Sequence, residues 1–184
     1  MTVTPDLGTA PLADPVIADP VIAGPELLRS AFRRHASGVA VITAPGDPAH
    51  GGRPVGFTAS SLTSVSAEPP LVSFGIGTSS SSWPAVSTAT HVGVHVLGED
   101  QRDLAATFAR SGADRFAAPT RWTPGPGGVP VLDGVLAWLV CRVVGRVPAG
   151  DHRIVVAEVV AGDPAAEAGR PLLYHHGRFN ALRD

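Results

Sequence analysis

The stretch VLAWLVCRVVGRV occupies residues 135–147, followed by PAGDH at 148–152 and RIVVAEVVA at 153–161. The two longer runs are dominated by Val and other aliphatic residues, a composition that favours β-strands. The segment between them contains Pro, Gly and Asp, which favour turns. We therefore predict a long β-hairpin that turns at residues 148–152.

Shorter segments with the same bias lie on both sides of this hairpin. Strands are predicted at 39–44, 54–61, 71–76, 91–97 and 171–179, and loops at 44–53 and 117–130. One helix is predicted to begin at Pro25 and end at Gly38, and another to cover 101–110. Strands and helices do not alternate, which argues against a parallel doubly wound sheet. The expected fold class is mainly β (α+β), an antiparallel barrel with short flanking helices.

The composition excludes several kinds of chemistry. The chain has 184 residues, a formal net charge of -2 and no Lys, so it offers neither a Schiff-base lysine nor a Walker-type phosphate lysine. Its Arg residues are scattered, which gives no basic stripe for nucleic acid. The lone cysteine, Cys141, lies in an apolar run and is interpreted as a buried structural thiol in a reducing compartment. We find neither a signal peptide nor the ~20 apolar residues that span a bilayer, so we expect a cytoplasmic protein with no membrane partner.

The first 24 residues differ from the rest of the chain. The sequence ADPVI occurs at 13–17 and again at 18–22, and the prolines of this segment forbid a helix. We expect a disordered or extended Pro/Ala/Asp-rich tail at 1–24 and one folded domain at 25–184. A passive extension and a partner-binding segment are the two readings of this tail.

Two hydroxyl-rich segments could bind a polar ligand. In GFTASSLTSVS at 56–66, an apolar strand runs into Ser and Thr residues that could bind the edge of a polar ring or a phosphate, or could form an ordinary loop. In TSSSSWP at 78–84, the proline could occupy the first turn of a helix whose N-terminus would attract an anion. A flexible linker with one capping serine is the alternative for this second segment.

The hairpin turn contains a histidine. Gly150 and Asp151 are ordinary turn residues, whereas His152 is either solvent-exposed or faces a pocket, where it could hold a nicotinamide carboxamide or a diphosphate. His91 and His95 share one face of a predicted strand, but no third ligand has suitable spacing, so we predict no metal site. The chain also lacks the nucleophile elbow of serine hydrolases and the glycine fingerprint of Rossmann domains.

The order and spacing of these segments resemble the flavin reductase-like family, and in particular the small reductase components of two-component flavin monooxygenases. The resemblance runs from about Phe32 to Leu182. The matching segments are ASGVAVIT at 36–43, GFTASSLTSVS at 56–66, EPPLV at 68–72, SSSWP at 80–84, residues 101–109, DRF at 114–116, GDH at 150–152 and LLYHHGRF at 172–179.

The resemblance implies an FMN-binding split barrel, and it implies a role for each matching residue. Thr58, Ala59, Ser60 and Ser61 would line the flavin ring and its ribityl chain, and Ser80, Ser81, Ser82 and Trp83 would cradle the flavin phosphate. Phe108 and Ala109 would flank the flavin, and Arg115, with Phe116 beside it, would neutralise the phosphate charge. His152, in the turn with Gly150 and Asp151, would contact the nicotinamide, and Tyr174 would close the pocket.

The same resemblance implies an NAD(P)H-dependent flavin reductase. Such an enzyme moves a hydride from NADH or NADPH onto FMN or FAD, acts as a homodimer, and passes reduced flavin to a separate oxygenase in a transient encounter. Two alternatives remain at this point: a flavin-retaining oxidase or oxygenase of the same fold, and a non-enzymatic barrel that binds flavin, haem or no ligand.

Overall fold

The computed structural model describes residues 23–46, 51–164 and 169–182, and the chain divides into two compact units, Met1–Phe32 and Arg33–Asp184. Most of the predicted tail, residues 1–22, and part of the predicted loop, residues 47–50, lie outside the described residues. Both predictions therefore stay predictions.

Helix α1 covers Pro25–Arg33 and begins at the residue that the sequence predicts. Proline suits the first turn because its missing N–H would have had no partner there. The prediction that this helix continues to Gly38 is wrong. Ser37–Gly38 form strand β1 instead, and their backbone pairs with β11 (Leu172–His175), a long-range contact that local spacing does not reveal.

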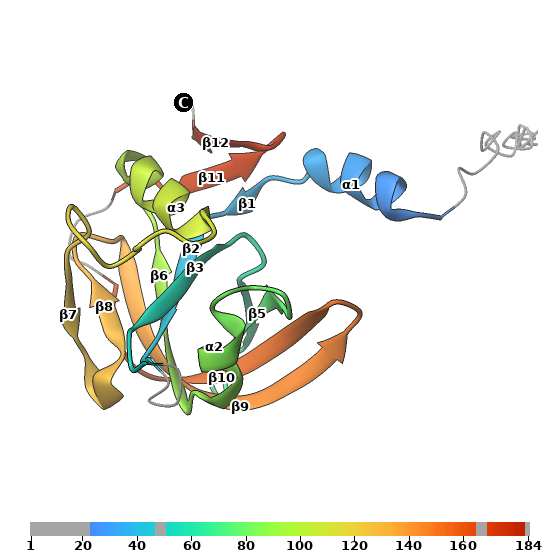
Figure 1. Ribbon diagram of the computed structural model, residues 1–184. Coiled ribbons are helices and arrows are strands. Elements are labelled where there is room, and N and C mark those ends of the chain that lie inside the picture. The colour runs from blue at the N-terminus through green and yellow to red at the C-terminus, as the bar shows by residue number, and fades with distance from the viewer. Residues whose placement is uncertain (1–22, 47–50, 165–168, 183–184) are drawn as a thin grey trace, which may run out of the picture. The chain divides into compact units, whose positions relative to one another are not determined.

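The unit Arg33–Asp184 is built around a seven-stranded sheet with the order β3-β2-β6-β9-β10-β5-β4 (Figure 1). All neighbouring pairs in it are antiparallel, and the sheet curls into a split barrel, which confirms the predicted fold class. The strands are β2 (Ala40–Ala44), β3 (Val55–Ala59), β4 (Thr63–Ser66), β5 (Leu71–Gly77), β6 (His91–Val96), β9 (Ala137–Ala149) and β10 (His152–Asp163).

Strands β9 and β10 form the predicted long hairpin, but their turn is tighter than the sequence suggests. Ala149 pairs with His152, so the turn consists of Gly150 and Asp151, and His152 belongs to a strand. Gly150 has a φ of 59°, a left-handed conformation that two-residue hairpin turns require and glycine adopts without strain.

Several short strands were missed. Residues 117–130, predicted as a loop, contain β7 (Trp122–Pro124), which pairs with β8 (Pro130–Leu132). β4 also went unpredicted, and the single strand predicted at 171–179 is a hairpin of β11 and β12 (Arg178–Ala181). These strands have only three or four residues each, too few to show a period.

Two helices of this unit begin close to the predicted positions. α2 covers Trp83–Thr88, with Pro84 in its first turn, and α3 covers Arg102–Ala109 after a short 3-10 turn at Glu99–Gln101. In Figure 1, α2 lies near β5 and β10, whereas α3 lies near β11. The two helices therefore flank different parts of the sheet.

The core consists of apolar clusters on both faces of the sheet. One cluster fills the barrel and includes Phe74, Ile76, Val86 and Cys141, and another packs α3 and β11 on the sheet through Phe108 and other residues. Cys141 has no exposed surface, which confirms a buried thiol, and burial raises its pKa to about 12.

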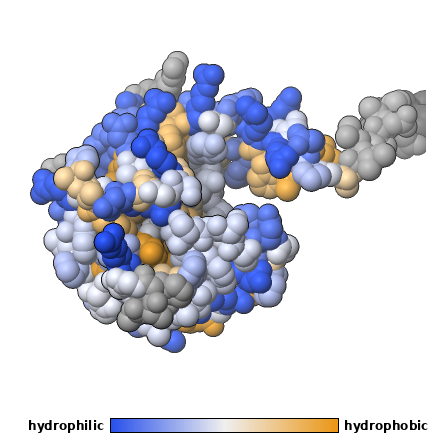
Figure 2. Space-filling model, in the orientation of Figure 1, coloured by the Kyte–Doolittle hydropathy of each residue, from blue (hydrophilic) through white to orange (hydrophobic). Residues whose placement is uncertain are grey.

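On the face seen in Figure 2, hydrophobic residues show only in small groups between hydrophilic ones. Within 23–46, 51–164 and 169–182, no helix is long and apolar enough to cross a membrane.

Candidate active site

One pocket gathers residues from the end of β3, from α3 and from the β11–β12 hairpin. It has a volume of about 450 Å³, and the predicted flavin residues Thr58, Ser60, Ala109 and Tyr174 all line it. Its other lining residues are Val39, Arg102, Gly177, Arg178 and Phe179. The structure therefore brings together residues that lie more than a hundred positions apart in the sequence.

The hydroxyls of β3 and its following loop are fixed by backbone contacts. Thr58 Oγ1 donates to the carbonyl oxygen of Ala105 at 2.6 Å, which anchors β3 to α3. Ser61 Oγ accepts a hydrogen bond of 2.9 Å from the backbone N–H of Gly75 in β5. Ala59, by contrast, is buried in the barrel core, so its backbone is what it can offer a ligand.

The three serines directly before α2, Ser80–Ser82, have different environments. Ser82 is fully buried, and its hydroxyl donates to the carbonyl oxygen of Gly56 at 2.9 Å. Ser80 Oγ accepts a hydrogen bond of 3.3 Å from the backbone N–H of Ser82. Ser81 is exposed, and its hydroxyl lies 3.4 Å from Nη1 and 3.5 Å from Nη2 of Arg115. Ser81 is therefore the serine of this group whose hydroxyl meets a cation.

Arg115 lies beside a second pocket of about 440 Å³, which Gly56 and Phe116 also line. Its Nη2 donates to the carbonyl oxygen of Arg110 at 2.8 Å. Its Nε is buried without a hydrogen-bond partner among the described residues, and burial lowers the pKa of the guanidinium. A half-buried cation with an unused donor beside Ser81 fits an anionic group such as a phosphate.

Three aromatic rings pack against one another next to Arg115. The rings of Phe108 and Phe116 meet edge to face at 5.4 Å, and Trp122 extends the stack at 5.5 Å from Phe116. Phe108 has no exposed surface, and a side chain at Gly56 would clash with its ring at 2.7 Å. Phe108 therefore contacts the site region through β3, and the place beside the flavin that the resemblance implies for it stays a prediction.

The hairpin turn is joined to the start of the serine segment. Thr78 donates to the carbonyl oxygen of Asp151 through its backbone N–H at 2.9 Å and its hydroxyl at 3.1 Å. The Asp151 carboxylate lies 2.7 Å from Nδ1 of His152, and this hydrogen bond, with the charge of His152, lowers the Asp151 pKa. A Cβ at Gly77 would lie 3.7 Å from Nε2 of His152, so the imidazole sits over the end of β5.

These contacts link the predicted residues into one region around the ends of β3 and β5. Thr78, which ties the hairpin turn to the serines, lies in the predicted segment 78–84, but no role of its own was predicted for it. Arg102 and Arg178, which line the pocket with Thr58, were not predicted as site residues. No spacing pattern marks them, because a contact between elements far apart in the chain leaves no period in the sequence.

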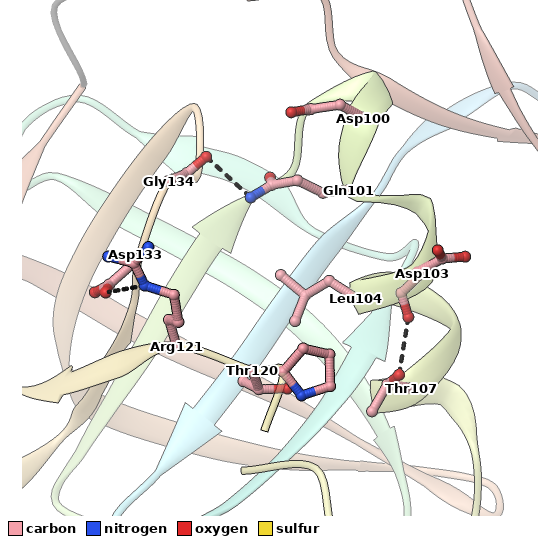
Figure 3. A pocket seen from close by; sticks show the side chains of 10 residues that line it. Asp100, Gln101, Asp103, Leu104, Thr107, Thr120, Arg121, Asp133 and Gly134 are labelled. Carbon is pink, nitrogen blue, oxygen red and sulfur yellow. Dashed lines mark hydrogen bonds and ion pairs between the residues drawn. The ribbon is translucent and has the colours of Figure 1, made fainter. Parts of the chain in front are cut away.

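A separate pocket lies between α3, the loop that leads into β7 and the turn that follows β8 (Figure 3). Four of its lining residues form two pairs: Gln101 Nε2 donates to the Gly134 carbonyl oxygen at 2.9 Å, and Arg121 forms an ion pair with Asp133 at 3.6 Å. In the view, Leu104 lies between Arg121 and the hydrogen bond from Thr107 to Asp103. None of the predicted flavin or nicotinamide residues lines this pocket.

Known proteins with similar sequences have related functions. The family model of the flavin reductase like domain matches residues 32–183. An NADH:FMN oxidoreductase of Rhodococcus qingshengii is 46% identical over 154 residues, which cover 82% of this chain and 78% of the relative. The reductase component of a 4-nitrophenol 4-monooxygenase/4-nitrocatechol 2-monooxygenase of Rhodococcus opacus is 42% identical over 151 residues, covering 82% of this chain and 77% of the relative.

Solved structures agree with the sequence relatives. A flavin reductase domain protein of Arthrobacter sp. FB24 superposes with a TM-score of 0.79 at 43% identity, covering 86% of this chain and 96% of that one. An NADH:FAD oxidoreductase of Streptomyces globisporus, solved in complex with NAD and FAD fragments, has a TM-score of 0.77 at 32% identity, covering 85% of this chain and 91% of that one. The shared fold, the extent of the match and the arrangement of the site lead to one assignment. This chain belongs to the flavin reductase-like family.

Proposed function

We propose that this chain is an NAD(P)H:flavin oxidoreductase that reduces FMN or FAD and supplies reduced flavin to a separate oxygenase. The observation that carries the proposal is the pairing of Ser81 with Arg115, whose buried Nε finds no hydrogen-bond acceptor in the described part of the chain. A phosphate there would receive hydrogen bonds from a hydroxyl and a guanidinium in a chain that has no lysine.

The flavin ring would lie at the ends of β3 and β5. Thr58 and Ser60 line a pocket there, and Ala109 and Tyr174 face the same space from α3 and β11. The Thr58 hydroxyl is held by Ala105, so β3 and α3 keep a fixed spacing, which a planar ring requires.

The nicotinamide would be held by the hairpin turn. His152 is about half exposed, and its ring orientation is set by Asp151 on one side and by the edge of β5 on the other. An imidazole nitrogen at this position can hydrogen-bond a carboxamide.

The flavin and the nicotinamide, when bound, supply the redox chemistry themselves. The protein needs no nucleophile, and its residues bind and orient the two ligands so that their rings stack in reacting distance. Arg115 and Ser81 would hold one end of the flavin, and His152 would place the second ring against it. Backbone N–H groups near Ser60 and Ser61 would stabilise negative charge on the flavin edge.

We propose NADH as the favoured donor and a homodimer as the working assembly. Relatives are named as NADH-dependent enzymes and as reductase components of monooxygenases, which supports this donor and a partner oxygenase. The outer face of the β9–β10 hairpin supports the dimer, because Val147 and Ile154 pair in register and expose 52% and 41% of their surface. A Val147→Glu variant that stays as large as the wild type in light scattering would exclude this face as the interface.

We further propose that residues 25–184 carry the activity and that residues 1–24 are dispensable. Deletion of 1–24 should leave turnover intact, and a large loss of rate would assign the segment a role.

The decisive test follows the nicotinamide absorbance band. Purified protein is mixed with NADH or NADPH and with FMN, FAD or riboflavin, and steady consumption of the nicotinamide with a free flavin supports the proposal. A protein that keeps its flavin through purification and consumes oxygen only with a further substrate would be an oxidase or oxygenase instead. A protein that neither binds flavin nor consumes NADH or NADPH would be a non-enzymatic barrel.

A further inference from the structure

Arg146 in β9 holds the C-terminal end of α2 through its side chain. Its Nε donates to the carbonyl oxygen of Val86 at 3.1 Å, and its Nη2 donates to the same oxygen at 2.9 Å and to that of Ala89 at 2.5 Å. Val86 lies in α2, and Ala89 directly follows it. Carbonyl groups at the end of a helix have no partner within it, so a cation that serves two of them stabilises the last turn.

α2 depends on such contacts with the rest of the fold. It has six residues, and a helix of that length is unstable by itself in water. Ala85 and Val86 are buried, and Ser82, just before the helix, is bonded to Gly56 of β3. The helix is thus fixed to β3 at one end and to β9 at the other.

The strand register explains how Arg146 reaches the helix. Arg146 pairs with Val155 of β10, whose side chain is fully buried, and cross-strand partners share one face of a sheet. The guanidinium is therefore directed toward the interior side, where burial lowers its pKa. Arg142, in the same strand, is exposed and forms an ion pair with Glu158 instead.

We propose that Arg146 is a positioning residue for the flavin phosphate: it fixes α2 so that Ser81 remains opposite Arg115. This inference rests on the proposed phosphate site and assigns Arg146 no contact with the flavin. Ser81 Oγ lies 3.4 Å from Nη1 of Arg115, and only Ser82 separates Ser81 from the first residue of α2. A rotation of α2 after loss of its C-terminal contacts would move the Ser81 hydroxyl away from the phosphate, but it would leave the ring pocket around Thr58 and Tyr174 in place.

The test compares FMN with riboflavin, which lacks the phosphate, by calorimetric titration of the full chain. Arg146→Met keeps the length of the side chain and removes its donors, and we expect it to weaken FMN binding about tenfold with riboflavin affinity changed less than about twofold. The FMN affinity of Arg146→Lys should lie between those of the wild type and Arg146→Met, because an ammonium keeps the charge but lacks the fork that serves two carbonyl groups. Arg142→Met, which makes the same change of charge in the same strand, should bind both flavins as the wild type does.

The outcomes separate this inference from the function on which it rests. A wild-type protein that binds FMN no better than riboflavin overturns the phosphate site and the role of Arg146 with it. A wild-type preference for FMN that Ser81→Ala reduces but both Arg146 variants keep overturns the role of Arg146 alone. An equal loss for FMN and riboflavin in Arg146→Lys, which retains a cation for α2, would show that Arg146 stabilises the fold without positioning the phosphate residues.

Discussion

The hydroxyl of Ser82 donates a hydrogen bond of 2.9 Å to the carbonyl oxygen of Gly56, and both residues are buried. The bond joins the segment before α2 to the middle of β3. Its neighbour Ser81 points the other way, toward Arg115. Adjacent serines in the motif that suggested a phosphate site therefore do different things: Ser82 fixes the segment and Ser81 is available to a ligand.

This division predicts that only one of two alanine variants loses stability. Ser82→Ala removes a buried hydrogen bond and leaves a carbonyl unsatisfied, so we expect its free energy of unfolding to fall by about 1–3 kcal/mol in urea denaturation. Ser81→Ala, at an exposed position, should change stability by less than about 0.5 kcal/mol. Equal stability of the two variants would show that the Ser82 bond is not part of the fold in solution.

Arg115 should determine how strongly the protein distinguishes FMN from riboflavin. Arg115→Gln removes the charge beside Ser81, and we expect FMN affinity to fall at least about tenfold because a charge-assisted contact to phosphate is lost. Riboflavin affinity should stay close to the wild-type value. Arg121→Gln is the matched control, since Arg121 pairs with Asp133 in the separate pocket of Figure 3. If Arg115→Gln binds FMN as tightly as Arg121→Gln does, the phosphate lies elsewhere.

His152 should act on the nicotinamide and hardly on the flavin. His152→Ala removes the ring that Asp151 orients over the end of β5, and we expect the KM for NADH to rise several-fold more than the Kd for flavin. The measurement is steady-state kinetics with varied NADH at saturating flavin, together with a flavin titration. His91→Ala, at the start of β6, serves as the control. Equal changes in both constants would remove the role assigned to His152.

The sequence predicts the frame of the fold well where periodic segments are long. The β9–β10 hairpin follows from two aliphatic runs and a Gly-Asp turn, and α3 follows from Leu104 and Phe108 at helical spacing. The strands β1, β7 and β8 could not be predicted this way, because each contains only two or three residues and is defined by its partner across the chain.

The candidate site is predicted at the level of segments and less well at the level of side chains. The hydroxyl-rich segments, Arg115 and the hairpin turn meet around β3 and β5, as the resemblance implies. The sequence cannot tell that Ser82 faces the interior and Ser81 the solvent, since the start of a short helix turns consecutive side chains in different directions. The resemblance places Phe108 beside the flavin, which stays a prediction; in the structure its ring belongs to a core cluster.

A buried histidine predicts how stability depends on pH. His95 has no exposed surface, Nδ1 lies 3.0 Å from the Val41 carbonyl oxygen, and Nε2 has no partner among the described residues. Desolvation lowers its pKa from 6.5 to about 4, and the hydrogen bond to Val41 offsets only part of this effect. In the unfolded chain the imidazole regains an ordinary pKa, so between these two values the unfolded state binds more protons than the folded state.

Stability from His95 is therefore complete above about pH 6.5 and declines as the pH falls toward 4. The shift corresponds to about 3 kcal/mol of unfolding free energy across this range. Urea denaturation of the wild type and of His95→Leu at a series of pH values measures it, because the carboxylates contribute equally to both proteins and cancel in the difference. The wild type should lose stability more steeply than His95→Leu below pH 6.5, since the leucine cannot take up a proton. Parallel pH profiles for the two proteins would contradict the prediction, because they would mean that His95 takes up a proton as readily in the folded state as in the unfolded chain.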